Sequence, residues 1–284
     1  RAKTTKMKSR LVSPTGKEIV LKPVRANAGV EAWYRKRLYQ MIDAMQKALV
    51  RGIEAQWKAN NPLALDAAIR DGSPANAMRR AMRRMSKRWL KAFDDGAEGL
   101  ARYFSEKAAG TTDLQLKAIL KKAGFTVEFK ATEAVNNAMQ AAIGENVSLI
   151  RSIAQQHLTE VEGLVMRAMT AGRDLGTLSK DLEKRYGITR RRAAFIARDQ
   201  ANKQTAVINR ARQQELGITQ ARWRHSGGGK HPRPSHLEAG QADGGKGKLY
   251  DVEKGCLIDG KYVLPGQLPN CRCTARSVIP GFDS

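Results

Sequence analysis

The chain has 284 residues, of which 42% are hydrophobic, so it can bury a substantial core in one large or two ordinary domains. It carries 51 Lys and Arg against 27 Asp and Glu, a formal net charge of +24 at pH 7. No run of 18 apolar residues occurs, and no apolar segment of a secretory signal follows the first residues. We therefore expect a protein that is kept in the cytoplasm of a cell or in a particle assembled there.

The excess of positive charge indicates a polyanionic partner. We expect nucleic acid and no membrane as partner, and an anionic membrane surface is the second candidate for such a charge. The first 50 residues carry twelve Lys and Arg against three acidic residues. Residues 1–15 are polar and basic, and we expect them to form a flexible tail. The alternative interpretation of the charge is a highly soluble surface.

Helical patterns cover most of the chain up to residue 216, and we expect residues 16–172 to form a helical region. Apolar residues at three- and four-residue steps predict a helix over 32–57, and Pro62 follows it. Ser73 and Pro74 begin a second helix over 73–93. Further predicted helices cover 111–124, 131–143, 146–171, 176–187 and 188–217, with glycines between them, and residues 125–130 predict a short strand.

The second predicted helix has one cationic face and one apolar face. Methionines and aromatic residues occupy the apolar face. A helix of this kind can contact phosphates with its solvent-exposed face and pack against other helices with its apolar face. The alternative is a charged face that is only solvated. The residues of this cationic face are Arg79, Arg80, Arg83, Arg84, Lys87, Arg88 and Lys91.

The composition changes after residue 217. Short strand-like pieces, "QARWRH", "KLYDV", "KYVL" and "TARSVI", alternate with stretches rich in Gly and Pro. The pattern predicts a small, loop-rich α/β unit after a largely helical N-terminal two-thirds, which makes the fold class α+β. Small units with little apolar core often need a disulfide or a bound metal ion for stability.

Histidine and cysteine are concentrated in this C-terminal unit. "HPRPSH" supplies His231 and His236, and "CRC" supplies Cys271 and Cys273. Two closely spaced pairs of such ligands are typical of a structural zinc site, although Cys-x-Cys is a weaker pattern than Cys-x-x-Cys. The alternative is that the histidines form hydrogen bonds and the cysteines are small buried side chains. An odd number of cysteines without a secretory signal argues against a disulfide framework.

A catalytic role for this cluster finds less support in the sequence. Metal-dependent nucleases of the ββα type pair a histidine with a second His or Asn at a strand-then-helix spacing, and that spacing does not occur here. A Cys/His acyl-transfer site stays open as a further alternative. We expect no catalytic residues and no enzymatic activity.

The order of landmarks from residue 175 to 280 resembles the phage Mu F-like minor head protein family, the phage head morphogenesis domain. In that family a long helix with Ala-Arg-Asp leads through a Gly to a strand with Trp, an Arg-x-x-His and a closing Pro-Gly-x-x-x-Asn-Cys-x-Cys. The acidic residue that usually precedes the Arg-x-x-His is replaced here by "GGGKH". The resemblance places the domain at residues 173–284, with Arg198, Trp223, Arg233 and Asn270 among its motif residues.

The resemblance implies a minor structural protein of the virion, attached to the portal protein at the portal vertex inside the capsid. Such proteins act in head assembly and in packaging or ejection of the double-stranded DNA, and other capsid or scaffolding proteins are further expected partners. The alternatives are a metal-dependent nuclease or toxin-like enzyme, and a DNA-binding protein unrelated to virions. Because the chain ends right after the family domain, we expect no appended C-terminal enzyme.

Overall fold

The computed structural model describes residues 8–9, 18–59, 73–172, 174–229 and 231–279. The described chain forms two compact units, each built from separate stretches of sequence. One unit comprises Ala32–Arg102 and Gly144–Ala197, and the other comprises Arg1–Glu31, Tyr103–Ile143 and Arg198–Ser284. Apart from Lys8–Ser9, the expected tail at residues 1–15 lies outside the described residues, and the domain boundary at residue 172 stays a prediction.

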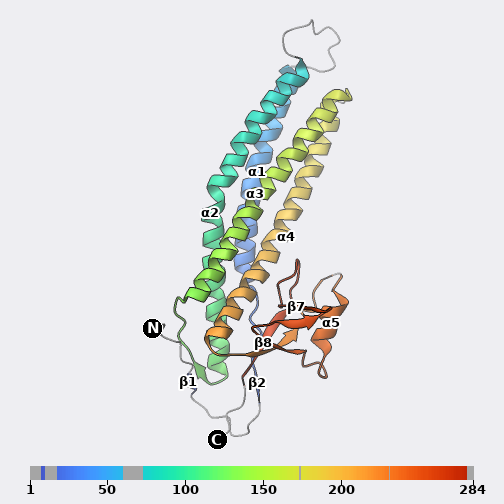
Figure 1. The fold of residues 1–284 in the computed structure, drawn as a ribbon. Helices are drawn as coiled ribbons and strands as arrows, with labels where there is room; N and C mark the ends of the chain where they lie inside the picture. The colour runs from blue at the N-terminus through green and yellow to red at the C-terminus, as the bar shows by residue number, and fades with distance from the viewer. Residues whose placement is uncertain (1–7, 10–17, 60–72, 173, 230, 280–284) are drawn as a thin grey trace. The chain divides into compact units, whose positions relative to one another are not determined.

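Four long helices supply most of the structure: α1 (Ala28–Ala59), α2 (Pro74–Lys122), α3 (Glu133–Thr170) and α4 (Leu175–Glu215). Segments of all four lie side by side in the first unit, a four-helix bundle (Figure 1). The stripe predicted for α1 is confirmed, because its buried side chains recur every three or four residues from Tyr34 to Trp57. No helix of the described chain combines the length and the apolar character that crossing a membrane requires.

The helices are longer and fewer than the sequence predicts. Gly172 and Gly217 follow helix ends with φ of 61° and 72°, as expected for glycine at a helix C-terminus. Gly144 and Gly187 lie inside α3 and α4, so the helix boundaries predicted there are wrong, as is the separate helix start at residue 111. An interior glycine costs about 1 kcal/mol relative to alanine. Packing of buried residues elsewhere in the two helices, such as Ile150 in α3 and Leu182 in α4, exceeds that cost.

One buried and one partly buried polar contact join the helices within the bundle. The Tyr34 hydroxyl donates to Asn146 Oδ1 at 3.0 Å, which links α1 to α3. Arg190 forms a two-bond contact with the Asp43 carboxylate at 2.7 and 2.9 Å, which links α4 to α1. These contacts fix which helix faces meet, because a buried polar group without a partner is costly.

The second unit contains a four-stranded antiparallel sheet in the order β2-β8-β4-β5. Its strands are β2 (Ile19–Val20), β8 (Thr274–Ile279), β4 (Gln220–Arg224) and β5 (Leu249–Asp251). The strands predicted at 220–225, 248–252, 261–264 and 274–279 are confirmed, the third as β7 (Lys261–Val263), which pairs with β6 (Cys256–Ile258). β2 comes from the N-terminal end of the sequence, far from the other three strands of its sheet. Helices in the N-terminal part and strands in the C-terminal part confirm the α+β class.

A short helix and a small strand pair complete this unit. The helix is α5 (Pro234–Gln241), which sequence periodicity does not predict because it has only 8 residues. The strand expected over 125–130 is shorter in the structure, where β3 (Phe125–Thr126) pairs with β1 (Lys8–Ser9).

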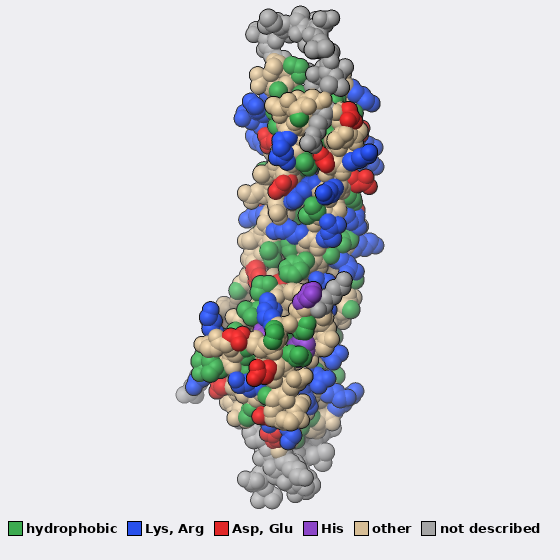
Figure 2. Space-filling model, turned by 90° about the vertical axis from the view of Figure 1, so that its right-hand side faces the viewer, with side chains coloured by type: hydrophobic (Ala, Val, Ile, Leu, Met, Phe, Trp, Pro, Cys, Tyr) green, Lys and Arg blue, Asp and Glu red, His purple; other side chains and the backbone are tan. Residues whose placement is uncertain are grey.

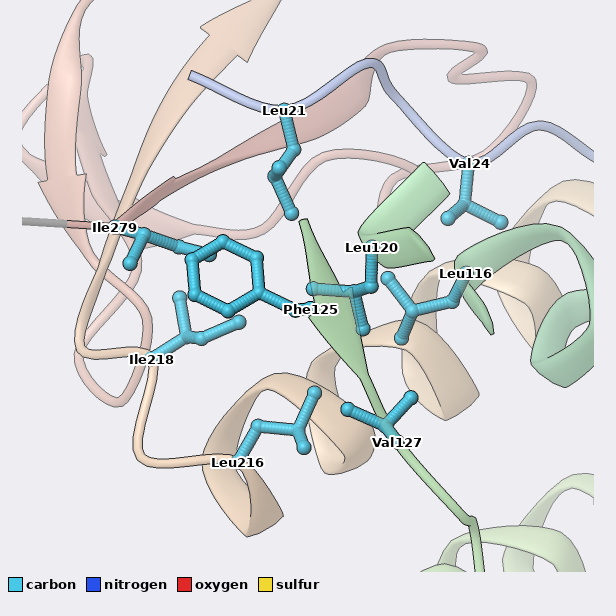
Figure 3. Packing of buried hydrophobic residues seen from close by; sticks show 9 residues of the cluster. All are labelled: Leu21, Val24, Leu116, Leu120, Phe125, Val127, Leu216, Ile218 and Ile279. Carbon is cyan, nitrogen blue, oxygen red and sulfur yellow. The ribbon is translucent and has the colours of Figure 1, made fainter. Parts of the chain in front are cut away.

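One apolar core of the second unit joins four distant parts of the sequence (Figure 3). Phe125 is 2% exposed and lies among Leu21, Ile218 and Ile279. This core ties the segment after β2 to the ends of α2, α4 and β8. A second core gathers around Trp223 and contains all three cysteines of the chain.

Candidate metal centre

Three side chains with metal-binding atoms converge in the Trp223 core. His236, Cys271 and Cys273 are buried, and their ligand atoms all lie within 4.8 Å of one another. Nδ1 of His236 is 3.6 Å from Sγ of Cys271 and 3.8 Å from Sγ of Cys273. We call these three residues the Cys/His cluster.

Two elements deliver the ligands of the Cys/His cluster. His236 lies in the first turn of α5, whose start is set by Pro234 and by Arg233 in an extended conformation at the N-cap position. Cys271 and Cys273 lie on the segment that leads into β8, after a turn in which the Cys271 N–H donates to the Leu268 carbonyl at 2.9 Å. The cluster therefore joins α5 to the entrance of β8.

Trp223 and Gly266 shape the surroundings of the cluster. The indole ring of Trp223 on β4 meets the His236 ring edge-on, with ring centroids 5.0 Å apart. The Gly266 N–H donates to Cys271 Sγ at 3.4 Å. A Cβ atom at residue 266 would lie 2.9 Å from the Cβ of Ala206 on α4, so the loop approaches the helix closely at this glycine.

The two thiols of the cluster have unequal acidity. A hydrogen bond from the Cys273 thiol, together with backbone N–H donors, lowers the pKa of Cys271 despite burial. The same hydrogen bond and burial raise the pKa of Cys273. Deprotonation therefore begins at Cys271.

The other predicted ligand lies elsewhere. The side chain of His231 is exposed, and His231 is not among the three converging residues. The structure thus brings together three of the four residues that the sequence nominates. Cys256, the third cysteine, lies in the same core on β6, and burial raises its pKa.

The motif residues Arg198, Arg233 and Asn270 meet at the loop before Cys271. Arg233 donates to the Pro269 carbonyl at 3.0 Å, and Arg198 donates to Asn270 Oδ1 at 3.5 Å. Asp199, the next residue on α4, accepts the backbone N–H of Asn270 at 2.5 Å. The motif therefore holds the loop that presents the cysteines, a role that sequence spacing alone does not reveal.

Arg222 on β4 is a further structural residue that sequence reasoning missed. Its guanidinium forms ion pairs with Asp243 at 2.8 Å and with Glu18 at 3.1 Å, and it donates to the Gly247 carbonyl. Glu18 directly precedes β2, so Arg222 helps to join that N-terminal strand to the sheet. No pattern in the sequence signals the pairing of Arg222 with Glu18, since these two residues are 204 positions apart.

The cationic face predicted on α2 lies on the surface. All seven of its side chains are exposed, while Met78, Met82 and Phe93 on the opposite side are buried. Within the described chain, Arg80, Arg83, Arg84, Lys87 and Arg88 make no hydrogen bond or ion pair, whereas Lys91 pairs with Asp95 at 2.9 Å. Figure 2 shows Lys and Arg side chains outnumbering Asp and Glu on the visible face.

These observations define a chain with a long-helical part and a small antiparallel sheet unit in which buried Cys and His side chains converge. Residues 159–276 match the family model described as "Phage Mu protein F like protein". The resemblance predicted from the sequence is thereby confirmed, and residues 159–276 are similar to the phage Mu F-like family. A phage head protein is the class that this family indicates.

One curated relative supports the match over a longer stretch. An uncharacterized protein of Haemophilus influenzae is 28% identical over 264 residues, which cover 91% of this chain and 55% of the relative. The chain thus spans about half the length of the relative that it matches. No solved structure matches the chain significantly.

Proposed function

We propose that this protein is a minor structural protein of a phage head, which associates with the portal protein inside the capsid. In this role it contacts packaged double-stranded DNA and takes part in head assembly and in DNA packaging or ejection. The Mu F-like domain supports the phage head role. The exposed cationic face on α2 supports the contact with DNA, and it is the observation that carries this part of the proposal.

The geometry of the cationic face suits a phosphate backbone. Its residues span positions 79 to 91, which at 1.5 Å per residue is about 18 Å of helix. Duplex DNA carries one negative charge per about 1.7 Å, so several phosphates lie within that length. Since five of the seven cations have no partner in the described chain, binding to phosphate breaks no ion pair that they make with its residues.

The β6–β7 hairpin is the surface that we propose for contact with the portal protein. Leu257 and Tyr262 face each other across its two strands and are 45% and 61% exposed. Two large apolar side chains exposed side by side are typical of a protein contact surface. We assign this hairpin to portal binding, and DNA to the cationic face.

The burial of the Cys/His cluster supports a structural protein over an enzyme. His236, Cys271 and Cys273 are 3%, 4% and 5% exposed. A nucleophile or a metal-bound water must reach its substrate, which these buried atoms do not readily allow. A nuclease or toxin-like activity is therefore the weaker alternative.

DNA binding is tested by gel retardation of duplex DNA with the full chain over a range of salt concentrations. The test variant changes Arg80, Arg83, Arg84, Lys87 and Arg88 to Ala, and the matched control changes the four arginines to Lys and keeps Lys87. We expect the Ala variant to bind more weakly. The slope of the logarithm of its binding constant against the logarithm of salt concentration should become shallower, by up to about 0.9 for each lost phosphate contact. Equal binding by the Ala variant would contradict the assignment of DNA to this face.

Portal association is tested by copurification from phage-producing cells. We expect the full chain to copurify with the portal protein and to be present in intact virions. The variant Tyr262→Glu should lose the portal and still bind DNA, since the hairpin and the cationic face are different surfaces. A chain that binds DNA but is absent from virions would instead support the alternative of a virion-independent DNA-binding protein.

A further inference from the structure

We propose that His236, Cys271 and Cys273 bind one zinc ion, which clamps α5 to the segment entering β8. The proposal concerns a metal site in the C-terminal unit and does not depend on the phage role. It names three protein ligands, because His231 is exposed and is not among the converging residues.

The distances between the ligand atoms match a tetrahedral zinc site. With Zn–S bonds of about 2.3 Å and Zn–N bonds of about 2.05 Å, the N-to-S edges of the tetrahedron are about 3.6 Å. The two edges from Nδ1 of His236 are 3.6 and 3.8 Å. Side chains that only pack together need not place three ligand atoms around a common centre.

The donor set selects zinc among the common metals. Two thiolates and one imidazole are soft to borderline ligands, whereas magnesium and calcium prefer oxygen. The three residues that converge include no carboxylate. Zinc also has no redox chemistry, so the ion can remain in a buried structural site.

The surroundings of the cluster suit bound thiolates. The Gly266 N–H that points at Cys271 Sγ stabilises negative charge on this sulfur. Trp223 packs against the His236 ring and restricts its rotation. The Pro269–Asn270 loop is held by Arg233 and Asp199, so the two cysteines are positioned before any metal binds.

The clamp has a structural consequence for this small unit. His236 and Cys271 are 35 residues apart in sequence, and after the end of α5 the intervening chain contains only short strands and turns. A metal ion that joins them replaces core packing that a unit of this size cannot supply. We therefore expect metal removal to lower the melting temperature and to expose the thiols.

The first experiment is elemental analysis of the full chain, purified without chelator. We expect about one zinc per chain, and less than about 0.2 would overturn the proposal. The variants His236→Ala, Cys271→Ser and Cys273→Ser should each lose most of the metal. Cys256→Ser is the matched thiol control and His231→Ala the matched histidine control, and both should retain it. Loss of the metal in His231→Ala would overturn the three-ligand assignment.

A second measurement on the unchanged protein covers variants that fail to fold. Cobalt(II) exchanged into the site should give the thiolate-to-cobalt charge-transfer absorption of a tetrahedral site with two sulfur ligands, and zinc should displace it. Titration of thiols in the denatured, anaerobically prepared chain should find all three cysteines reduced. A cobalt spectrum without thiolate bands, or a single free thiol, would overturn the proposal, because one thiol means that Cys271 and Cys273 are joined as a disulfide.

Discussion

Asp199 on α4 accepts the backbone N–H of Asn270 at 2.5 Å and so anchors the loop that precedes Cys271. Asn270 has a φ of 58°, in the left-handed region, and an anchored amide helps to hold that conformation. The carboxylate also pairs with Lys203 at 3.1 Å on its other oxygen. A helix side chain thus controls a loop 71 residues further along the chain.

Replacement of Asp199 tests this anchor. Asp199→Ala leaves the Asn270 amide without its acceptor, and we expect the free energy of unfolding in urea to fall by about 1–3 kcal/mol. Asp199→Asn keeps an oxygen that can accept the bond and should cost less. If the two variants were equally destabilised, the ion pair with Lys203 would be the important contact instead.

Gly247 and Gly244 form a matched pair for a steric prediction. Both have positive φ, 92° and 66°, but a Cβ at 247 would lie 2.0 Å from the Trp223 carbonyl oxygen, whereas at 244 nothing lies within 4 Å. We expect Gly247→Ala to destabilise the protein by about 3 kcal/mol or more, and Gly244→Ala by about 1 kcal/mol. Thermal unfolding of the two variants measures the difference. Similar melting temperatures would show that β4 moves away at little cost.

Arg212 near the end of α4 is the centre of a buried ionic network. It contacts Asp113 with two bonds of 2.9 and 2.7 Å and Glu215 at 2.7 Å, and only 5% of its side chain is exposed. We expect Arg212→Met to cost about 3–5 kcal/mol, because Asp113 and Glu215 both lose their contact with this buried guanidinium. Lys91→Met, which breaks an exposed pair with Asp95, should change stability by less than about 1 kcal/mol. Urea unfolding of both variants compares the two cases.

His157 gives the bundle a predicted dependence on pH. Burial, with a smaller effect of nearby Arg185, lowers the pKa of His157 to about 4. Its ring contacts Thr189 Oγ1 at 2.9 Å and Gln46 Oε1 at 3.1 Å. The neutral form satisfies both contacts when Nε2–H donates to Gln46 and the Thr189 hydroxyl donates to Nδ1 instead of to the Arg185 carbonyl, 3.2 Å away. The folded state therefore keeps this histidine neutral.

The sign of the pH effect follows from linkage. Between the unfolded pKa of 6.5 and the folded value of about 4, the unfolded chain binds the additional proton. Stability from His157 is therefore complete above pH 6.5 and falls as pH decreases to 4, by about 3 kcal/mol in total. Urea unfolding of the wild type and of His157→Gln across this range isolates the contribution. A constant difference between the two proteins at every pH would contradict the lowered pKa.

The sequence by itself determined the helical class of the N-terminal part, the C-terminal strands, the cationic face and the resemblance to the phage Mu F-like family. These features depend on local periodicity and on motifs whose residues lie close together in the chain. The apolar stripe of α1 and the strand at 220–225 needed no information from distant residues. The same is true of the run of exposed Arg and Lys in α2, because every residue of that face lies within thirteen positions.

Only the tertiary structure decided which local signals persist. Gly144 and Gly187 do not end their helices, since packing along the bundle outweighs a local cost of about 1 kcal/mol. Ile19 and Val20 pair with residues of β8 that lie some 260 positions away in the sequence. No local pattern spans that distance, so the sequence does not predict this pairing. His236 rather than His231 meets the cysteines because α5 turns one of them into the Trp223 core and leaves the other on the surface. Long-range packing and hydrogen bonding set these outcomes, and they act only once distant segments have come together.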